Sequence, residues 1–183
     1  DPDINDHDKF VIVVGDGRTP RTAGVIAFNS RIECLSIDPL MDFQACNKWF
    51  KDTGVERLGV DGHKVEDLEI RPLQAECSIK QEVIIIYPHS HAPMGYLYGL
   101  IKAPSVITIA MPCCIPIPPF LANQRHISYA DKGVLSGKNK IHVWHHVMDN
   151  KGVMVNAIGI NRARLTRSLL LPYTADQERE EIR

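Results

Sequence analysis

The sequence lacks long hydrophobic runs and lacks net charge of either sign. Lys and Arg together number 21 and Asp and Glu 22, which gives a formal charge of −1 over 183 residues. A large basic surface for nucleic acid is therefore not expected, although a local patch remains open. No apolar run approaches the roughly 18–20 residues that cross a bilayer, so we expect no contact with a membrane.

The start of the chain also lacks the features of a secretory leader. Residues Asp1–Asp8 are acidic where a leader would begin with basic residues. The five cysteines contain no C-x-x-C pair, and adjacent cysteines such as Cys113 and Cys114 rarely bridge each other because the geometry is strained. We therefore expect a reduced, intracellular and cytoplasmic setting. Cys34 and Cys46 are expected to be small buried hydrophobic residues.

What is present is a globular composition, with 44% hydrophobic and 23% charged residues. The length suits one domain, and two independent cores would be hard to fit. We expect a flexible N-terminal segment over residues 1–9, one domain over 10–168 and a polar tail over 169–183. Eight histidines stand beside the five cysteines, and this surplus raises a metal hypothesis.

Short apolar segments alternate with helical or loop segments as far as residue 111. The expected strands are Phe10–Val14, Arg31–Ile37, Glu56–Val60, Glu82–Tyr87 and Ser105–Met111. The expected helices are one that begins at Thr19-Pro20, as N-cap and first helical position, and two over Phe43–Asp52 and Pro93–Ile101. Strands that alternate with helices predict a parallel α/β sheet.

The last expected strands break this alternation. Ile141–Met148 and Val153–Ile160 flank the turn sequence DNKG, which predicts a β-hairpin. The fold class we expect is a single three-layer α/β domain, with a mostly parallel sheet and an antiparallel C-terminal hairpin strand. His142, Trp144 and His146 share one face of their strand, and we expect that face to pack under a helix or to meet solvent.

A candidate ligand site follows the first strand, where open α/β sheets bind their ligands. The turn reads GDGRTP, in which Gly15 and Gly17 permit a tight backbone and the helix opening at Thr19 offers free N–H groups. Asp38 ends the second strand 23 residues after Gly15, where an acidic side chain can accept ribose hydroxyls. No Gly-Lys-Ser/Thr follows, so the turn is not a P-loop, and Pro20 occupies the third-glycine position of G-x-G-x-x-G.

The segments VVGDGRT, LSID, HKVEDL, IIIYPHSHAP and ITIAMPCC, in this order, resemble a divergent class I S-adenosylmethionine-dependent methyltransferase. The resemblance covers nearly the whole chain, about residues 10–165. It implies a Rossmann-like fold and S-adenosylmethionine as the cofactor. The family's first loop reads G-x-G-x-G after an acidic residue two places earlier. Here Thr19 replaces the third glycine and Val13 stands at the acidic position, with Asp16 as the candidate replacement.

The residues that the resemblance assigns to the cofactor fall on three loops. They are Gly15, Asp16 and Gly17 for the methionine part, Asp38 for the ribose, and Lys64, Val65 and Glu66 for the adenine. The loop after the fourth strand would face the acceptor. His89 is the expected general base, which would take a proton from a hydroxyl or amine. The other expected substrate-binding residues are Pro88, His91, Cys113 and Cys114.

Two other interpretations of this loop stay open. His89 and His91 could bind zinc with Cys113 or Cys114, because the fourth and fifth strands are neighbours in the expected topology. The spacing is not that of known zinc motifs and methyl transfer needs no metal, so we expect none. The same residues could also serve only to stiffen loops.

A basic run follows the last expected strand. Arg162, Arg164 and Arg167 could touch nucleic acid, but the acidic stretch Asp176–Glu181 dilutes their charge. A solvated terminus is therefore the favoured interpretation.

Three functions remain on the sequence alone. The first is S-adenosylmethionine-dependent methyl transfer to an unidentified acceptor, with RNA or protein favoured. The second is a catalytically inactive methyltransferase-fold protein that binds an RNA or protein partner as an assembly subunit, which the lost third glycine and Val13 favour. The third is a NAD-type nucleotide-binding enzyme, against which the terminal hairpin counts.

Overall fold

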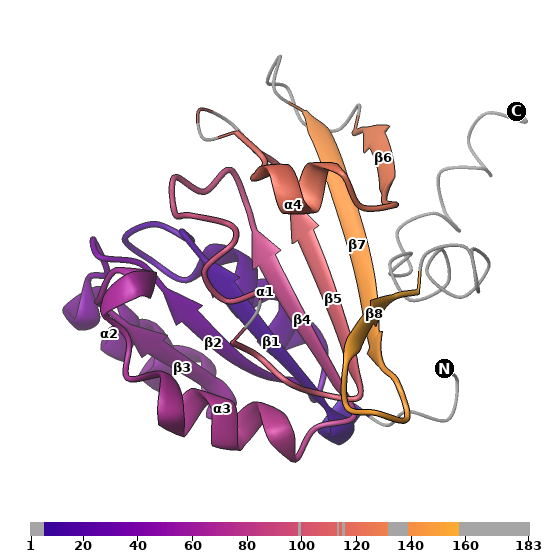
Figure 1. Ribbon diagram of the computed structural model, residues 1–183. Helices are drawn as coiled ribbons and strands as arrows, with labels where there is room; N and C mark the ends of the chain where they lie inside the picture. Colours follow the sequence, from indigo (N-terminus) through magenta and orange to yellow (C-terminus); the bar gives the residue numbers. More distant parts are fainter. Residues whose placement is uncertain (1–5, 99, 113, 115, 132–138, 158–183) are drawn as a thin grey trace, which may run out of the picture.

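The structure of the protein is a computed structural model (Figure 1), which describes residues 6–98, 100–112, 114, 116–131 and 139–157. The strands within those ranges are β1 (Lys9–Val14), β2 (Glu33–Ile37), β3 (Leu58–Asp61), β4 (Glu82–Tyr87), β5 (Ser105–Ala110), β6 (Ile127–Ala130), β7 (Lys140–Met148) and β8 (Met154–Asn156). The helices are α1 (Arg21–Asn29), α2 (Phe43–Thr53), α3 (Ile70–Ser78) and α4 (Pro119–Ala122), with the 3-10 turns η1 (Asp6–Asp8) and η2 (Val65–Asp67).

These strands form one mixed sheet with the order β3-β2-β1-β4-β5-β7-β6, and β8 pairs with β7. Strands β1 to β5 are parallel, whereas β7 runs antiparallel to β5, β6 and β8. This confirms the expected α/β class, the mostly parallel sheet and the antiparallel hairpin at the end. Insertion of β7 between β5 and β6 distinguishes the sheet from the six-stranded parallel dinucleotide-binding order.

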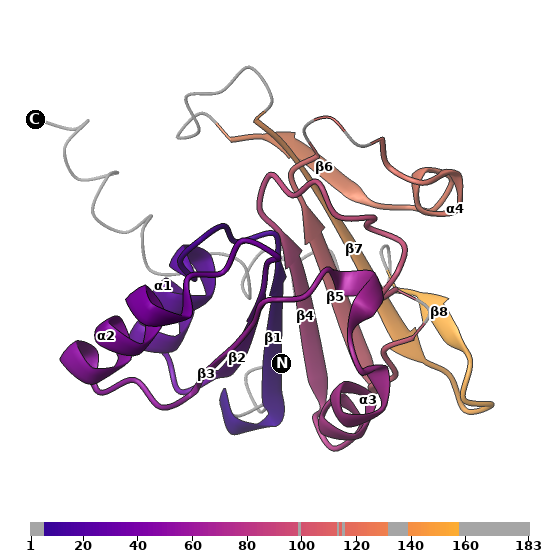
Figure 2. The same ribbon diagram turned by 90° about the vertical axis from the view of Figure 1, so that its left-hand side faces the viewer.

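Helices cover both faces of the sheet, which makes three layers (Figure 2). Strand β1 is buried on both sides: Phe10, Ile12 and Val14 join the core beneath α3, and Val11 and Val13 join the core beneath α1 and α2. A continuous apolar run is the pattern expected for a central parallel strand. No helix among the described residues is long and apolar enough to cross a membrane.

Two expected local structures are wrong. Thr19 does not cap α1: the helix begins at Arg21, and the carboxylate of Asp16 accepts the free N–H groups instead. The described residues of Pro93–Ile101 form successive turns and no helix. Gly95 lies so close to Phe120 that an added Cβ would be 2.7 Å from the ring. The conformation of this segment is therefore determined by its packing against Phe120.

Helices α3 and α4 and strand β6 were not expected from the sequence. Pro72 stands in the first turn of α3, where proline is tolerated because the first N–H groups have no helical partner. Strand β6 has only four residues and three of them are exposed, so it has little hydrophobic pattern. Strand β6 is therefore decided by its pairing with β7 and not by a local sequence pattern.

The end of the chain matches the hairpin prediction as far as it is described. The turn after β7 is closed by Asp149, whose carboxylate accepts the N–H groups of Lys151 and Val153. Positions 158–160 of the expected last strand lie outside the described residues, as do the basic run at 162–167 and the tail 169–183. Of the segment expected to be flexible, residues 6–9 form η1 and the start of β1, and residues 1–5 lie outside.

The histidine face of β7 packs under a helix, as one of the two expectations stated. Trp144 is fully buried and its indole N–H donates to the carbonyl of Leu121 in α4 at 3.0 Å. His142 and His146 on the same face are also buried.

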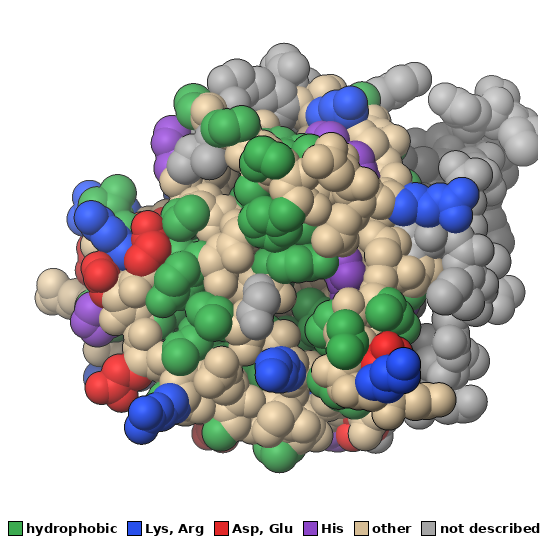
Figure 3. Space-filling view, in the orientation of Figure 1, with side chains coloured by type: hydrophobic (Ala, Val, Ile, Leu, Met, Phe, Trp, Pro, Cys, Tyr) green, Lys and Arg blue, Asp and Glu red, His purple; other side chains and the backbone are tan. Residues whose placement is uncertain are grey.

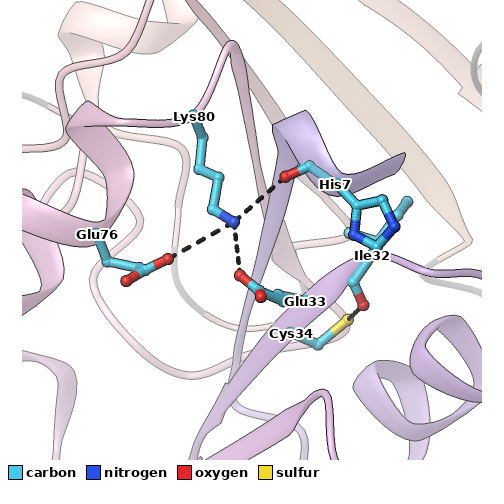
Figure 4. A network of polar contacts seen from close by, with 6 residues as sticks. All are labelled: His7, Ile32, Glu33, Cys34, Glu76 and Lys80. Carbon is cyan, nitrogen blue, oxygen red and sulfur yellow. Dashed lines mark hydrogen bonds and ion pairs between the residues drawn. The ribbon is translucent and has the colours of Figure 1, made fainter. Parts of the chain in front are cut away.

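A buried lysine ties elements together at the amino ends of the strands, the end opposite the candidate site (Figure 4). The ammonium group of Lys80 contacts Glu33 of β2 at 2.5 Å, Glu76 of α3 at 3.6 Å and the carbonyl of His7 at 3.3 Å. Burial alone would lower the pKa of Lys80, but the hydrogen bond and charge of Glu33, with Glu76, outweigh it and raise that pKa. The lysine therefore stays charged and joins η1, β2 and α3.

Candidate functional site

A cleft of about 410 Å³ opens at the carboxyl ends of β1, β2 and β4. The strand order changes direction there, because β2 lies on one side of β1 and β4 on the other. The cleft is lined by Val14, Gly15, Ile37, Asp38, Pro39, Leu40, Lys64, Val65, Glu66, His89, Ser90, His91, Ala92 and Pro93. The structure thus brings together most of the expected site residues, from four loops.

Gly15 is the point at which two of these loops touch. Its φ is +79°, and an added Cβ would lie 2.7 Å from the Cβ of Ser90 and closer still to its hydroxyl. Its N–H donates to the carbonyl of Ile37 at 2.8 Å. Glycine is therefore required twice, by the backbone conformation and by the close approach of the loop after β4.

Asp38 is held rigidly at the floor of the cleft. It is buried, with 7% of its surface exposed. One carboxylate oxygen accepts the N–H of Gly17 and the other accepts the N–H of Leu40, both at 2.8 Å. A carboxylate has about four acceptor positions, so each oxygen can accept a further hydrogen bond from a ligand hydroxyl.

Gly17 and Asp16 do not line the cleft, although both were expected at the cofactor. Gly17 has φ +87° and serves to hold Asp38. The Asp16 carboxylate accepts the N–H groups of Thr22 at 2.8 Å and Ala23 at 3.0 Å and the hydroxyl of Ser36 at 3.2 Å. It caps α1, where negative charge is favourable.

His89 is the one described residue other than glycine with a positive φ, at +56°. A side chain in this conformation costs about 1–3 kcal/mol, and such positions cluster at functional sites. The loop is fixed by Ser90, which is 5% exposed and accepts the N–H of Ala92 at 3.0 Å. His89 and His91 both line the cleft, whereas the expected Pro88 does not.

The third wall comes from the loop after β3. Val65 is buried in the core and anchors η2, while Lys64 and Glu66 on either side line the cleft. The hydroxyl of Tyr96 donates to the carbonyl of Glu66 at 3.1 Å and joins this wall to the loop after β4. Leu40, which was not expected, completes the rim and is 70% exposed.

The cysteines divide into buried and exposed groups. Cys34, Cys46 and Cys77 are buried, which confirms the expectation for the first two. Burial raises the pKa of Cys34 and of Cys77 to about 12 and raises that of Cys46, so these thiols stay protonated and unreactive. Cys114 is exposed and is not part of the cleft, and Cys113 lies outside the described residues.

Metal binding finds no support in the part of the chain that the structure describes. No group of three or more His, Cys, Asp or Glu there could hold a metal ion. The alternative that included Cys113 concerns a residue outside that part.

A stack of rings lies near the carboxyl end of β5 and was not predicted from the sequence. His126 lies 5.1 Å from both His142 and Trp144, measured between ring centres. His142 pairs with Ala110, the last residue of β5. Burial, with the nearby His126, lowers the pKa of His142, so its ring is neutral at pH 7. The only sequence signal was the shared face of His142 and Trp144, and His126 gave none.

A second, larger hollow of about 680 Å³ lies between α1 and α2. It is lined mainly by apolar side chains, among them Val25, Phe28 and Trp49. It contains none of the expected catalytic or cofactor residues, so the smaller cleft remains the candidate site.

Comparison with known proteins gives a distant structural resemblance. No family model matches the sequence, and no curated protein matches it. Among solved structures, one that resembles it is an RNA methyltransferase from Salinibacter ruber in complex with S-adenosyl-L-homocysteine. The identity is 16%, the match covers 78% of this chain and 83% of that chain, and the TM-score is 0.47.

Proposed function

We propose that the protein binds S-adenosylmethionine in the cleft and transfers its methyl group to an acceptor. One observation carries the proposal. Gly15, Asp38 and the Lys64–Glu66 loop line a single cleft together with His89, at the switch point of the sheet. These are the loops on which the sequence resembles class I methyltransferases.

The cleft suits a nucleoside-bearing ligand in size and in chemistry. Its volume of about 410 Å³ falls within the range of small-molecule sites, about 300–1,000 Å³. The bare Cα of Gly15 leaves the backbone open to close approach, and Asp38 keeps acceptor capacity for ribose hydroxyls. Lys64, Val65 and Glu66 would hold the base.

The chain's own contribution to methyl transfer is alignment and proton removal. When bound, S-adenosylmethionine supplies an electrophilic methyl group on a sulfonium. Asp38 and the Gly15 turn would fix the donor in one orientation, which is the main requirement of an in-line displacement. A neutral ring nitrogen of His89 would accept the proton of the acceptor's hydroxyl or amine as the new bond forms.

RNA or protein is the acceptor class that we favour, presented by a partner or held locally. The formal charge of −1 argues against unaided binding of a nucleic acid over many phosphates.

Calorimetry with S-adenosylmethionine, S-adenosylhomocysteine and NAD tests the cofactor. We expect both sulfur nucleotides to bind the wild type and NAD to bind at least tenfold more weakly. Asp38→Ala should abolish binding, and Asp38→Asn, which keeps the size and one oxygen, should weaken it. Asp42→Asn is the matched control, because Asp42 also accepts a backbone N–H, that of Ala45, but lies outside the cleft. Failure of both sulfur nucleotides to bind would refute the proposal, and preference for NAD would favour the third function.

A binding subunit without catalysis is the second candidate. Val13 stands at the family's acidic position and is fully buried, and the carboxylate of Asp16 is occupied by the N–H groups at the start of α1. The first loop therefore offers no acidic side chain to S-adenosylmethionine. Binding of S-adenosylhomocysteine without methyl transfer to any RNA or protein fraction would support this candidate. Transfer that is lost in His89→Ala but retained in His63→Ala would support the enzyme.

A further inference from the structure

The ring stack of His126, His142 and Trp144 gives a partly exposed ring a rigid support. The three ring centres lie 5.1, 5.1 and 5.7 Å apart, which is a nearly equilateral triangle. Both partners are therefore on one side of His126, and both are buried, with 7% of His142 and 0% of Trp144 exposed. His126 itself is only partly buried, so the exposed part of its ring faces away from them.

The orientation of the His126 ring is fixed by a backbone contact. Its Nδ1 lies 3.0 Å from the carbonyl oxygen of Gln124. Because a carbonyl oxygen can only accept, Nδ1 carries the proton of the neutral ring and Nε2 is an acceptor. Gln124 is held in turn by Tyr98 and His146, which contact its side-chain oxygen. The ring is thus positioned in advance, and its Nε2 has no hydrogen-bond partner among the described residues.

The neighbours of this ring are polar and basic. Lys140 alternates with His142 on β7, so both side chains share the face of the ring stack. Burial, followed by the charges of His126 and Lys140, lowers the pKa of His142, so the ammonium group of Lys140 lies near enough to the rings to act on them. Lys140 is exposed and has no ion-pair partner in the described part of the chain. Ser128, which pairs with His142 between β6 and β7, is exposed as well.

The ring stack lies at the same end of the sheet as the cleft. His142 pairs with Ala110, the last residue of β5, and Ala110 pairs with Tyr87, the last residue of β4. His89 follows Tyr87 by two residues. Two strand spacings, about 10 Å, separate β4 from β7, and Figure 1 shows β7 next to β5. A ligand on the rings would therefore lie beside one that is held at His89.

We propose that the ring of His126 is a stacking platform for one base of a single-stranded RNA, next to the nucleotide that presents the acceptor. The position beside the acceptor rests on the proposed methyl transfer, whereas the platform itself does not. Bases of single-stranded RNA stack on aromatic and histidine rings and form hydrogen bonds through their free edges. Nε2 of His126 accepts a base N–H, and Lys140 contacts the adjoining phosphate.

Single-stranded RNA fits this surface better than a duplex or a protein. A duplex hides the faces of its bases and is bound mainly through its backbone, for which a formal charge of −1 is unfavourable. A protein partner would need a pocket for an apolar anchor. The exposed residues that adjoin the ring in sequence or share its face are instead polar or basic, namely Arg125, Ser128 and Lys140. Stacking requires one ring and few charges, and this surface has both.

Fluorescence anisotropy with labelled oligoribonucleotides at low salt tests the platform. The probes are a short oligoadenylate, the same strand with abasic residues, and a duplex of equal length. His126→Ala should weaken binding of the oligoadenylate about tenfold, and His126→Phe, which keeps a ring, should stay within threefold of the wild type. Tyr129→Ala is the matched control and should change nothing, because Tyr129 is an exposed ring on the opposite face of β6. Should His126→Ala unfold, His126→Leu takes its place, since leucine fills the space without a π-face.

The abasic strand and the duplex should bind the wild type at least tenfold more weakly than the oligoadenylate. Lys140→Gln should lower the slope of log affinity against log salt by about 0.7, the value for one phosphate contact in a single strand, and Lys48→Gln on α2 should not. Equal affinity for the abasic strand, or equal losses in His126→Ala and His126→Phe, would overturn the proposal. Absence of binding by the oligoadenylate also overturns it and leaves a protein as the acceptor.

Calorimetry with S-adenosylhomocysteine on the same proteins separates this inference from the proposed function. His126→Ala should bind the nucleotide as the wild type does, because His126 does not line the cleft. A wild type that binds S-adenosylhomocysteine but not the oligoadenylate would refute the platform alone. The reverse result would refute the proposed function and support the platform.

Discussion

Gly15 and Asp38 show how single residues build the cleft from backbone contacts. Gly15 has no side chain, so Ser90 can pack directly against its Cα. The carboxylate of Asp38 accepts one backbone N–H from each of two turns. Neither residue is present only for a ligand. Each fixes the position of a loop that a ligand would touch, so the site is preorganised before anything binds.

Substitution of the two turn glycines should separate backbone strain from steric clash. Gly15 and Gly17 both have positive φ, but an added Cβ at Gly17 meets nothing within 4 Å. We expect Gly17→Ala to cost about 1–2 kcal/mol from conformation alone. Gly15→Ala should cost clearly more, because the added carbon also meets Ser90. Urea unfolding of the two variants measures the difference, and equal losses would contradict the close approach.

Asp16 and Asp38 should differ in what their removal affects. Loss of a helix cap costs about 1 kcal/mol, so Asp16→Ala should lower the free energy of unfolding by that amount. Because its carboxylate points to α1, affinity for S-adenosylhomocysteine should change less than threefold. Unfolding and calorimetry on the same sample test both points. A loss of affinity as large as that in Asp38→Ala would contradict this prediction and show that Asp16 contributes to ligand binding.

At the scale of elements, a polar cluster connects the loop after β4 to the hairpin. The hydroxyl of Tyr98 contacts Nε2 of His146 at 2.7 Å and Oε1 of Gln124 at 3.0 Å, and these two side chains are 2.6 Å apart. Asn156 of β8 donates to the same amide oxygen at 3.4 Å. The cluster thus joins the loop between β4 and β5, the segment after α4, and strands β7 and β8.

His146 should make stability depend on pH. Burial, with the nearby His145, lowers the pKa of His146 to about 4. The unfolded chain then binds more protons than the folded one, so stability is complete above about pH 6.5 and falls toward pH 4 by up to about 1.4 kcal/mol per pH unit. His146→Gln should flatten this slope, and the exposed His63→Gln should not. Urea midpoints between pH 4 and 7 measure it; identical slopes in wild type and His146→Gln would contradict the assignment.

At the scale of the whole molecule, the two edges of the parallel sheet differ: one carries the cleft and the other a network of ion pairs. Carboxyl ends meet at the cleft, and amino ends are joined by Lys80 with Glu33 and Glu76. Figure 3 shows apolar side chains extending across the middle of the face seen in Figure 1, with charged groups mainly toward its edges. Such a surface has no extended basic region on this side, in agreement with the near-zero net charge.

Ligand binding should stabilise the whole domain. A ligand at one hundred times its Kd adds about 2.7 kcal/mol to the folded state, which for a chain of this size raises Tm by roughly 5–10 °C. We expect this shift with S-adenosylhomocysteine, at most about half of it with NAD at the same concentration, and none in Asp38→Ala. Differential scanning fluorimetry measures all three. A shift of equal size in Asp38→Ala would show that the ligand binds elsewhere, for example between α1 and α2.

The sequence by itself determined the strands β1, β4 and β5, the hairpin and the general position of the cleft. Continuous apolar runs and turn residues are local signals, and parallel strands bring their carboxyl ends to one edge. Gly15, Asp38, Lys64–Glu66 and His89 could therefore be placed together without a structure.

Only the tertiary structure decided which of those residues face the cleft and which support it. Asp16 turned out to cap α1, and Ser90 and Leu40 joined the site, because these outcomes depend on contacts between loops far apart in sequence. The turns at Pro93–Ile101 and the ring stack on His126 have the same origin. Local sequence fixes the backbone's preferences, whereas close packing between elements selects where each side chain points.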